Sequence, residues 1–241
     1  MNSHDPKDLA LIEKMGADAN VSRLSNELFN EACRFRYSYN FTWMGRPIIQ
    51  FPQDMVAIQE IIWKVKPDLI VETGIAHGGS LIFSASLLEL LGGDGIVVGV
   101  DIDIRAHNRE AIESHAMAKR IKLIQGSAIT PEVLVQVNKY AEGRKCILVI
   151  LDSNHSHEHV LRELELYSPL VLPGSYLIVC DTVVEDMPED LCEGRPWGPG
   201  DSPKTAVRAF LKQNRRFEVD LEYEHKLLLS VCPEGYLRCL A

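Results

Sequence analysis

One segment constrains the fold more than any other. It is an apolar run that ends in an acidic residue and continues through a glycine-rich turn into a helix: Asp68-Leu-Ile-Val-Glu72-Thr-Gly74-Ile-Ala-His-Gly78-Gly79-Ser80. A second apolar run follows the helix and ends at Asp101. Two strands joined by a glycine-rich turn and a helix, the second tipped by a carboxylate, are typical of the nucleoside-binding half of an α/β fold. The alternative is a strand-to-helix turn that binds no ligand.

The spacing of the glycines favours one class of nucleoside. Glu72-x-Gly74-x-x-x-Gly78 differs from the G-x-G-x-x-G pattern that cradles a pyrophosphate, and it carries an acidic residue at the turn. A cationic nucleoside such as S-adenosylmethionine suits this turn better than NAD. We therefore expect Glu72, Gly74 and Gly78 to surround its methionine and ribose portions, with His77 and Ser80 of the same turn also binding the cofactor.

Three further residues complete the expected cofactor site. Asp101 stands where an acid would bind the ribose hydroxyls, and Ser127, which follows the strand ending at Gln125, would approach the adenine. Asp152 follows a later strand and would meet the cofactor at the same edge of the sheet.

Predicted strands and helices alternate along most of the chain. Apolar runs predict strands over residues 68–72, 96–101, 121–125, 146–151 and 175–180, and helical spacing lies between them over residues 79–91, 105–117, 131–139 and 157–167. Such alternation predicts an α/β fold with a doubly wound, mostly parallel sheet that is covered on both faces. Residues 217–220 and 226–231 are strand-like and predict an antiparallel C-terminal hairpin.

The N-terminal part and one late loop follow other patterns. Residues 7–39 and 53–65 have helical spacing, and residues 41–54 between them are rich in aromatic residues and proline. We expect residues 1–66 to form a helical extension or lid and residues 67–241 to form the cofactor-binding domain, within one compact unit. The long loop 182–204 contains Trp197 and is typical of a lid or a binding segment, with a disordered linker as the alternative.

Composition argues against several kinds of partner. The 241 residues have a formal net charge of −9 and no basic stripe, which argues against nucleic acid. No run approaches the roughly 18 apolar residues of a membrane span, and no apolar signal core stands at the start. Six scattered cysteines form no C-x-x-C pair, so they predict neither a zinc knuckle nor a disulfide framework. A reducing cytoplasm fits this pattern.

A second group of polar residues follows the later strands. Asp152 and His155 come after the strand that ends at Leu151, and Asp181 comes after the strand that ends at Cys180. Carboxylates gathered at one sheet edge suit Mg²⁺, which keeps some of its waters and binds substrate oxygens. His155 would then accept the proton of a substrate hydroxyl whose pKa the metal lowers. In the alternative interpretation, Asp152 only caps the next helix and the histidines are solvated.

The sequence resembles the cephalosporin hydroxylase family, which includes the rhamnosyl and macrolide-sugar O-methyltransferases. The resemblance covers nearly the whole chain and is most specific in four segments: 67–80, 99–105, 151–159 and 173–176. It implies a class I, Rossmann-like methyltransferase fold, S-adenosylmethionine as the cofactor, and a Mg²⁺ site for a hydroxylated small molecule. It also favours a homo-oligomer, as do the amphipathic N-terminal helices.

The resemblance also implies roles for individual residues. The Asp-x-x-His step of the macrolide members falls on Asp152 and His155, as one metal ligand and the general base. The family's Glu-Asp pair of metal ligands falls on Cys180 and Asp181, and a thiol is a poor ligand for Mg²⁺. Either the metal is held more weakly, or a nearby carboxylate replaces the thiol, or metal dependence is lost; the nearby carboxylates are those of Glu185 and Asp186.

Together these patterns predict O-methylation of a sugar or secondary metabolite. Two alternatives remain open at this point. An iron-dependent oxygenase would use Asp152, His155 and His157 as a facial triad. A non-catalytic protein would keep the nucleoside pocket and have a decayed metal site at Cys180.

Overall fold

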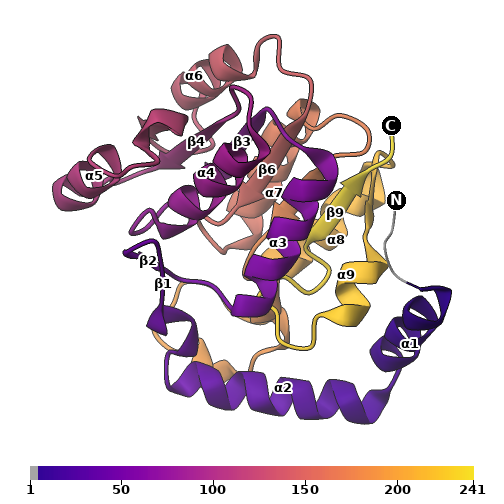
Figure 1. The fold of residues 1–241 in the computed structure, drawn as a ribbon. Helices are drawn as coiled ribbons and strands as arrows, with labels where there is room; N and C mark the ends of the chain where they lie inside the picture. The colour runs from indigo at the N-terminus through magenta and orange to yellow at the C-terminus, as the bar shows by residue number, and fades with distance from the viewer. Residues whose placement is uncertain (1–4) are drawn as a thin grey trace.

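The centre of the molecule is a mostly parallel sheet with the strand order β5-β4-β3-β6-β7-β9-β8. A computed structural model describes residues 5–241 and shows this sheet with helices on both faces (Figure 1). The strands are β3 (Leu69–Thr73), β4 (Ile96–Asp101), β5 (Ile121–Gln125), β6 (Ile147–Leu151), β7 (Tyr176–Val179), β8 (Phe217–Val219) and β9 (Tyr236–Cys239). All pairs from β5 to β7 are parallel, whereas β9 is antiparallel to both of its neighbours. The predicted doubly wound sheet is confirmed.

The strand order reverses at β3, which lies between β4 and β6. In the register of the sheet, Thr73 pairs with Val100 on one side and with Leu151 on the other. The three strands therefore end at the same level, and the residues that follow them meet at one edge. Ligands of open α/β sheets bind in the crevice at such a reversal.

The helices cover the two faces of the sheet because the strand residues alternate in direction. Ile70 of β3 packs in one core cluster with residues of α3 (Pro52–Val65) and α4 (Gly79–Leu91). Leu69 and Val71 pack in a second cluster with residues of the opposite layer. That layer consists of α6 (Pro131–Ala141), α7 (His157–Tyr167) and α8 (Pro203–Gln213). The β3 strand is fully buried, as its unbroken apolar run predicts.

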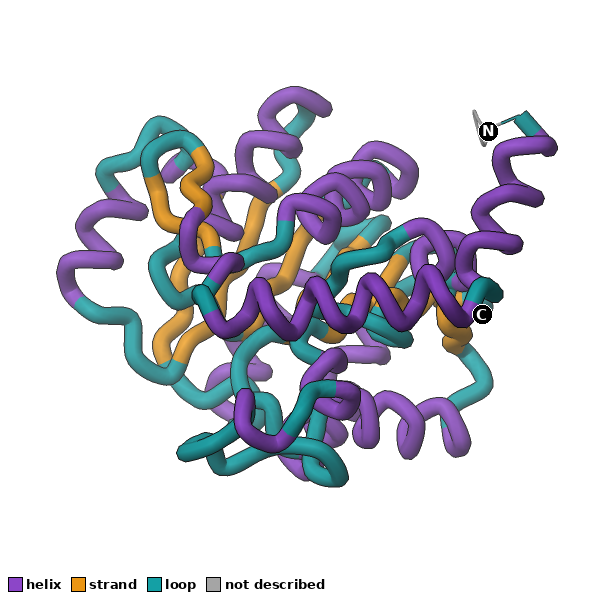
Figure 2. Tube along the Cα trace, turned by 90° about the horizontal axis from the view of Figure 1, so that it is seen from below, coloured by secondary structure: helices purple, strands orange, loops and turns teal. Residues whose placement is uncertain are grey.

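The N-terminal part is helical, as predicted, and lies beside the carboxyl edge of the sheet. It contains α1 (Pro6–Gly16), α2 (Ala19–Arg34), the 3₁₀ helix η1 (Tyr37–Asn40) and a small hairpin of β1 (Phe41–Trp43) and β2 (Arg46–Ile48). Figure 2 shows α2 crossing in front of the strands when the molecule is seen from below. Its role as a lid and the division at residue 66 stay predictions, as does the homo-oligomer.

One predicted helix is shorter than expected. The helix α5 covers Ala106–Glu113 rather than residues 105–117, and the 3₁₀ helix η2 (Ala118–Arg120) follows it. Beyond the end of α5, His115 Nδ1 accepts from the backbone N–H of Met117 at 3.1 Å.

The antiparallel C-terminal hairpin is present, but the predicted position of its second strand is wrong. The partner of β8 is β9 rather than residues 226–231. The segment before β9 starts with α9 (Leu221–Lys226), which the Asp220 carboxylate caps. Ser230 Oγ and the Val231 backbone N–H then donate to the buried Asp54 carboxylate at 2.6 and 2.8 Å, so a side chain and not a neighbouring strand satisfies this apolar run.

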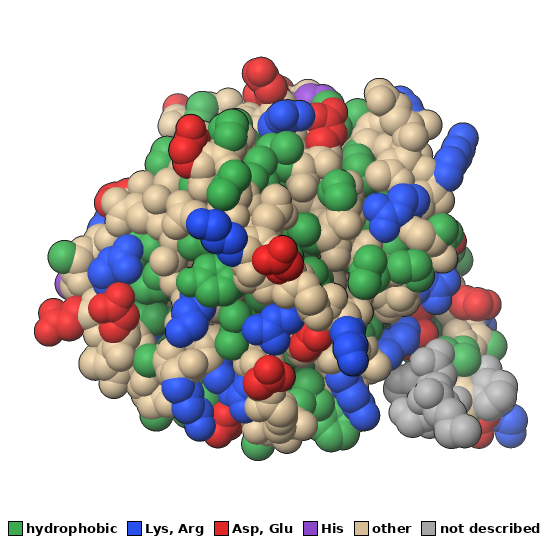
Figure 3. Space-filling view, turned by 90° about the horizontal axis from the view of Figure 1, so that it is seen from above, with side chains coloured by type: hydrophobic (Ala, Val, Ile, Leu, Met, Phe, Trp, Pro, Cys, Tyr) green, Lys and Arg blue, Asp and Glu red, His purple; other side chains and the backbone are tan. Residues whose placement is uncertain are grey.

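Charged side chains of both signs lie on the surface. On the face seen in Figure 3, Lys and Arg side chains are interspersed with Asp and Glu. Within residues 5–241, none of the helices has the length and apolar character that crossing a membrane requires.

Candidate functional site

A cavity of about 540 Å³ lies at the carboxyl edge of the sheet. Its floor is made by the turns that follow β3, β4, β6 and β7, which contribute Gly74, Asp101, Asp152 and Asp181. Its roof comes from α2 and from the loop 182–204. Members of both predicted groups, the nucleoside residues and the metal residues, therefore line one cavity.

The turn after β3 needs its glycines. Gly74 has a φ of +80°, and a Cβ there would lie 2.0 Å from the backbone oxygen of Asp152. Gly78 also has a φ of +80°, and its Cβ would collide with the Ile112 side chain at 2.4 Å. Because glycine has no Cβ, the turn packs closely against Asp152 and Ile112. Gly74 also lines the cavity.

Asp101 is held rigidly beside that turn. Its Oδ2 accepts from the backbone N–H of Ile75, and its Oδ1 accepts from the backbone N–H of Asp103, both at 2.9 Å. Each carboxylate oxygen can accept a second hydrogen bond. Because Asp101 lines the cavity, it is placed to receive two neighbouring hydroxyl groups.

Glu72 lies behind this floor rather than in it. Its side chain is buried, Oε1 accepts from Ser80 Oγ, and Oε2 has no partner among the described residues. Burial raises the pKa of Glu72 to about 7. Gln50 Oε1 is a second buried acceptor without a partner, and both residues border a small void of about 10 Å³ beside Asp152. Two unpaired acceptors here favour a ligand group that only donates, such as an ammonium.

Two other predicted cofactor residues lie to the side. His77 borders a small void next to the turn, and its backbone oxygen accepts from the Arg46 guanidinium at 3.1 Å. Ser127 does not line the 540 Å³ cavity, and its backbone oxygen accepts from Thr130 Oγ1 at 2.9 Å.

The acidic cluster forms as the strand tips predict. Ligand atoms of Asp152, His155 and Asp181 all lie within 4.8 Å of one another, and they are the only such group of possible metal ligands in residues 5–241. His155 Nε2 is 3.1 Å from Asp181 Oδ2. Burial, and then the Asp181 carboxylate, raise the pKa of Asp152 well above its ordinary value. Carboxylates crowded in this way are what a divalent cation stabilises, so the donors present fit Mg²⁺.

The loop 182–204 is packed against this cluster. The indole of Trp197 makes an edge contact with the His155 ring, with a centroid separation of 4.9 Å. Asp201 Oδ1 accepts from the backbone N–H of His157 at 2.7 Å, which ties the loop to the start of α7. The alternative of a disordered linker is therefore wrong, and the binding-segment interpretation fits. Trp43, in the aromatic-rich segment 41–54, packs on α4, where its Nε1 donates to Ser86 Oγ at 3.1 Å.

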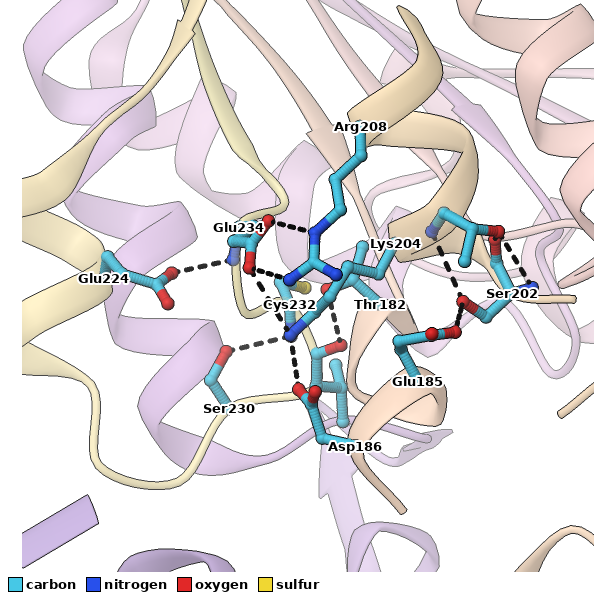
Figure 4. A network of polar contacts seen from close by, with 12 residues as sticks. Thr182, Glu185, Asp186, Ser202, Lys204, Arg208, Glu224, Ser230, Cys232 and Glu234 are labelled. Carbon is cyan, nitrogen blue, oxygen red and sulfur yellow. Dashed lines mark hydrogen bonds and ion pairs between the residues drawn. The ribbon is translucent and has the colours of Figure 1, made fainter. Parts of the chain in front are cut away.

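Asp181 owes its position to a polar network behind it. It has a φ of +54° and immediately precedes the 3₁₀ helix η4 (Thr182–Asp186). Glu185 Oε2 accepts from Ser202 Oγ at 2.7 Å, and Asp186 forms an ion pair with the buried Lys204 (Figure 4). Glu185 and Asp186 are thus engaged with α8, and neither replaces the missing carboxylate ligand.

Cys180 is not brought into the ligand group. Its side chain is buried in the core, and it is hydrogen-bonded to Cys232. That hydrogen bond and the burial raise the pKa of the Cys180 thiol well above its ordinary value. Because a neutral buried thiol is a poor partner for Mg²⁺, the site has two carboxylates where the family pattern implies three.

The two histidines that follow His155 in the same segment bond other residues and do not join the acidic cluster. His157 Nδ1 bonds Thr205 Oγ1 at 2.8 Å, and His159 Nε2 bonds Ser153 Oγ at 3.1 Å. An iron triad of Asp152, His155 and His157 is therefore not assembled.

Several cavity residues lie outside the sequence predictions. Gln50 and Arg195 come from irregular segments, and the helical spacing of residues 7–39 gives no sign that Cys33 and Arg36 line a site. Only the chemical type of these four residues could have drawn attention to them.

Comparisons with known proteins agree on one family. A model of the family described as rhamnosyl O-methyltransferase/CmcI matches residues 35–240. The rhamnosyl O-methyltransferases of Mycobacterium tuberculosis (strain H37Rv) and Mycobacterium leprae are similar to this chain. Each is 30% identical, over 199 and 200 residues, and the matches cover 81% of this chain and 77% and 82% of those proteins.

Solved structures share the fold. A CmcI structure with Mg and SAM is 21% identical with a TM-score of 0.58, over 84% of this chain and 78% of that one. An O-methyltransferase from Bacillus cereus in complex with SAH is 17% identical with a TM-score of 0.54, over 95% of this chain and 100% of that one. These likenesses confirm the predicted class I methyltransferase fold.

Proposed function

The chain belongs to the rhamnosyl O-methyltransferase/CmcI family and is an S-adenosylmethionine-dependent methyltransferase, and we propose that it methylates a sugar hydroxyl with the help of Mg²⁺. The observation that carries this proposal is the shared cavity, which holds Asp101 at one end of its floor and the cluster of Asp152, His155 and Asp181 at the other. The matched relatives are rhamnosyl O-methyltransferases, which supports a sugar as the acceptor.

The cofactor end of the cavity suits a cationic nucleoside. When bound, S-adenosylmethionine supplies an electrophilic methyl group on its sulfonium. Asp101 would accept hydrogen bonds from the ribose hydroxyls, and Gly74 would let the nucleoside approach the backbone closely. The unpaired oxygens of Gln50 and Glu72 would accept from the ammonium group of the methionine portion.

The acceptor end of the cavity suits a hydroxyl group that must lose its proton. Asp152 and Asp181 would hold Mg²⁺, which lowers the pKa of a hydroxyl next to it. His155 would accept that proton, and the Asp181 carboxylate, 3.1 Å from Nε2 of the ring, would stabilise the imidazolium that forms. Trp197 covers the His155 ring and limits access of water on that side.

Geometry accounts for much of the expected rate. Methyl transfer is an in-line displacement, and fixing the acceptor oxygen near contact with the methyl carbon supplies a large part of the acceleration. The chain does this by placing the base and the nucleoside site on adjacent strand ends of a rigid sheet.

Calorimetry combined with an activity assay tests this function. The purified protein should bind S-adenosylmethionine, and it should methylate one or more members of a panel of rhamnosides and related sugars. Chelation with EDTA should lower this activity, and added Mg²⁺ should restore it. Absence of cofactor binding would contradict the proposal, and so would binding without transfer to any sugar of the panel.

A further inference from the structure

We propose that the acceptor carries an anionic group, a carboxylate or a phosphate, and that Arg36 and Arg195 bind it at the roof of the cavity. This inference rests on the proposed function, since it names the class of sugar that the same site takes. Both arginines line the 540 Å³ cavity, one from the segment after α2 and the other from the loop 182–204.

The two guanidinium groups lack acidic partners. Within residues 5–241, neither Arg36 nor Arg195 forms an ion pair with a carboxylate or donates a side-chain hydrogen bond. Arg36 only stacks on the Tyr39 ring, at 4.2 Å from its centroid. By contrast, Arg34 next to the cavity pairs with Asp190 at 2.6 Å. Both guanidinium groups are exposed and lie at the cavity, so they are free to bind an anion that enters it.

Both arginines lie on the acceptor side of the cluster. Arg36 directly follows α2, and its backbone N–H donates to the Cys33 oxygen at 2.9 Å. The Arg34–Asp190 ion pair, at 2.6 Å, joins this end of α2 to the loop 182–204, which carries Arg195 and begins directly after Asp181. Cys33 lines the cavity together with both arginines. Asp101, which would hold the ribose, follows β4 on the opposite side of β3 from Asp181.

This location separates the arginines from the cofactor. The methionine portion would lie by Gly74 and the unpaired oxygens of Gln50 and Glu72, behind Asp152. The roof that carries the arginines is joined to the loop that begins after Asp181, so we expect their guanidinium groups to bind a group on the acceptor. Guanidinium binds carboxylate and phosphate through the same paired N–H groups, so the structure favours acidic sugars of both kinds over neutral ones.

Binding to the cofactor-loaded protein tests the inference independently of catalysis. The protein is saturated with S-adenosylhomocysteine and Mg²⁺ and titrated with glucuronate, glucose 6-phosphate or glucose. We expect one or both acidic sugars to bind about tenfold more tightly than glucose, the usual scale for a hydrogen-bonded charge. Comparison of the two acidic sugars tells a carboxylate site from a phosphate site.

Substitutions then identify the groups responsible. Arg195→Gln and Arg36→Gln should each reduce the preference for the acidic sugar, and the double variant should abolish it. The affinity for S-adenosylhomocysteine should not change. Arg215→Gln is the matched control, because it removes the same charge from an arginine that does not line the cavity.

Two outcomes would overturn the inference. One is equal binding of glucose and both acidic sugars. The other is a loss of S-adenosylhomocysteine affinity in Arg195→Gln, which would assign the arginines to the carboxylate of the cofactor. Because these readouts measure binding, failure to find a methylated product would count against the proposed function and leave this test intact.

Discussion

Asp101 shows how a single side chain links the backbone to the ligand. It accepts from two backbone N–H groups, so its carboxylate is oriented before any nucleoside arrives. An oriented carboxylate loses little entropy on binding two hydroxyls, which makes its charge-assisted hydrogen bonds effective.

The Asp101→Ala substitution should therefore weaken S-adenosylmethionine binding tenfold or more, as measured by calorimetry. Asp103→Ala is a suitable control, since Asp103 is an exposed neighbour outside the cavity. Unchanged affinity in Asp101→Ala would remove this residue from the cofactor site.

His155 should be separable from cofactor binding. The His155→Ala variant should keep its affinity for S-adenosylmethionine and lose about 10²–10⁴-fold in turnover, the usual range for a missing general base. His107→Ala, in an exposed position of α5, should retain full turnover. If His155→Ala kept wild-type turnover, the ring would only be packing against Trp197.

Glu163 predicts a pH dependence of stability. Burial raises its pKa from 4.5 to about 7, and its Oε1 accepts from Ser153 Oγ at 2.8 Å. The folded state then keeps a proton that the unfolded state has released, so the free energy of unfolding falls as pH rises from 4.5 through 7. The full effect is on the order of 3 kcal/mol.

Urea titrations at pH 5 and pH 8 test this dependence. Glu163→Gln should reduce the difference in unfolding free energy between the two pH values by the share of one carboxyl, because the buried Glu72 and Asp54 contribute in the same direction. Glu158→Gln at an exposed position should not change it. An unaltered pH dependence in Glu163→Gln would mean that the carboxyl is ionised in the folded protein at both values.

At the scale of elements, η4 and α8 act together behind Asp181. Asp181 lies in the left-handed region, where a non-glycine residue needs support from its surroundings. The support comes from the contacts of Glu185 and Asp186 with Ser202 and Lys204. The buried Lys204 is also 3.8 Å from Glu234 in the segment before β9 (Figure 4).

Lys204→Met should loosen η4 and lower the affinity for Mg²⁺ several-fold while leaving cofactor affinity unchanged. The Mg²⁺ concentration that gives half-maximal activity measures the effect. Arg208→Met removes the neighbouring, half-exposed cation of the same network and should behave like the wild type. Equal Mg²⁺ requirements in Lys204→Met and the wild type would show that η4 holds Asp181 without this ion pair.

The sequence predicts some of these elements well and others poorly, for a physical reason. Strands β3 and β6 are buried on both faces, so their apolar runs are unbroken and their ends fall within a residue of the prediction. Residues 226–231 include three consecutive leucines, but the Ser230 hydroxyl and the Val231 backbone N–H bind Asp54, which lies far away in the chain. A pattern within one segment contains no sign of such a distant partner.

The same distinction holds for the site. Asp101, Asp152 and Asp181 follow strands directly, so the topology of the sheet brings them together. Gln50 and Arg195 reach the cavity from irregular segments, whose paths depend on tertiary packing. The burial of Cys180 with Cys232 likewise depends on β9 entering the sheet beside β7.

At the scale of the whole molecule, the cavity needs both the sheet and the N-terminal helices. Phe29 and Cys33 of α2 line its roof, and the Arg34–Asp190 ion pair joins α2 to the loop 182–204. The predicted extension is thus part of the site wall. We propose that this one cavity takes both the nucleoside and the metal.

An anomalous-scattering crystal structure with S-adenosylhomocysteine and Mn²⁺ as a substitute for Mg²⁺ tests that claim most directly. We predict an anomalous peak between the carboxylates of Asp152 and Asp181, with the ribose of the nucleoside against Asp101 in the same cavity. A nucleoside bound outside this cavity, or a manganese peak only at other residues, would contradict the account.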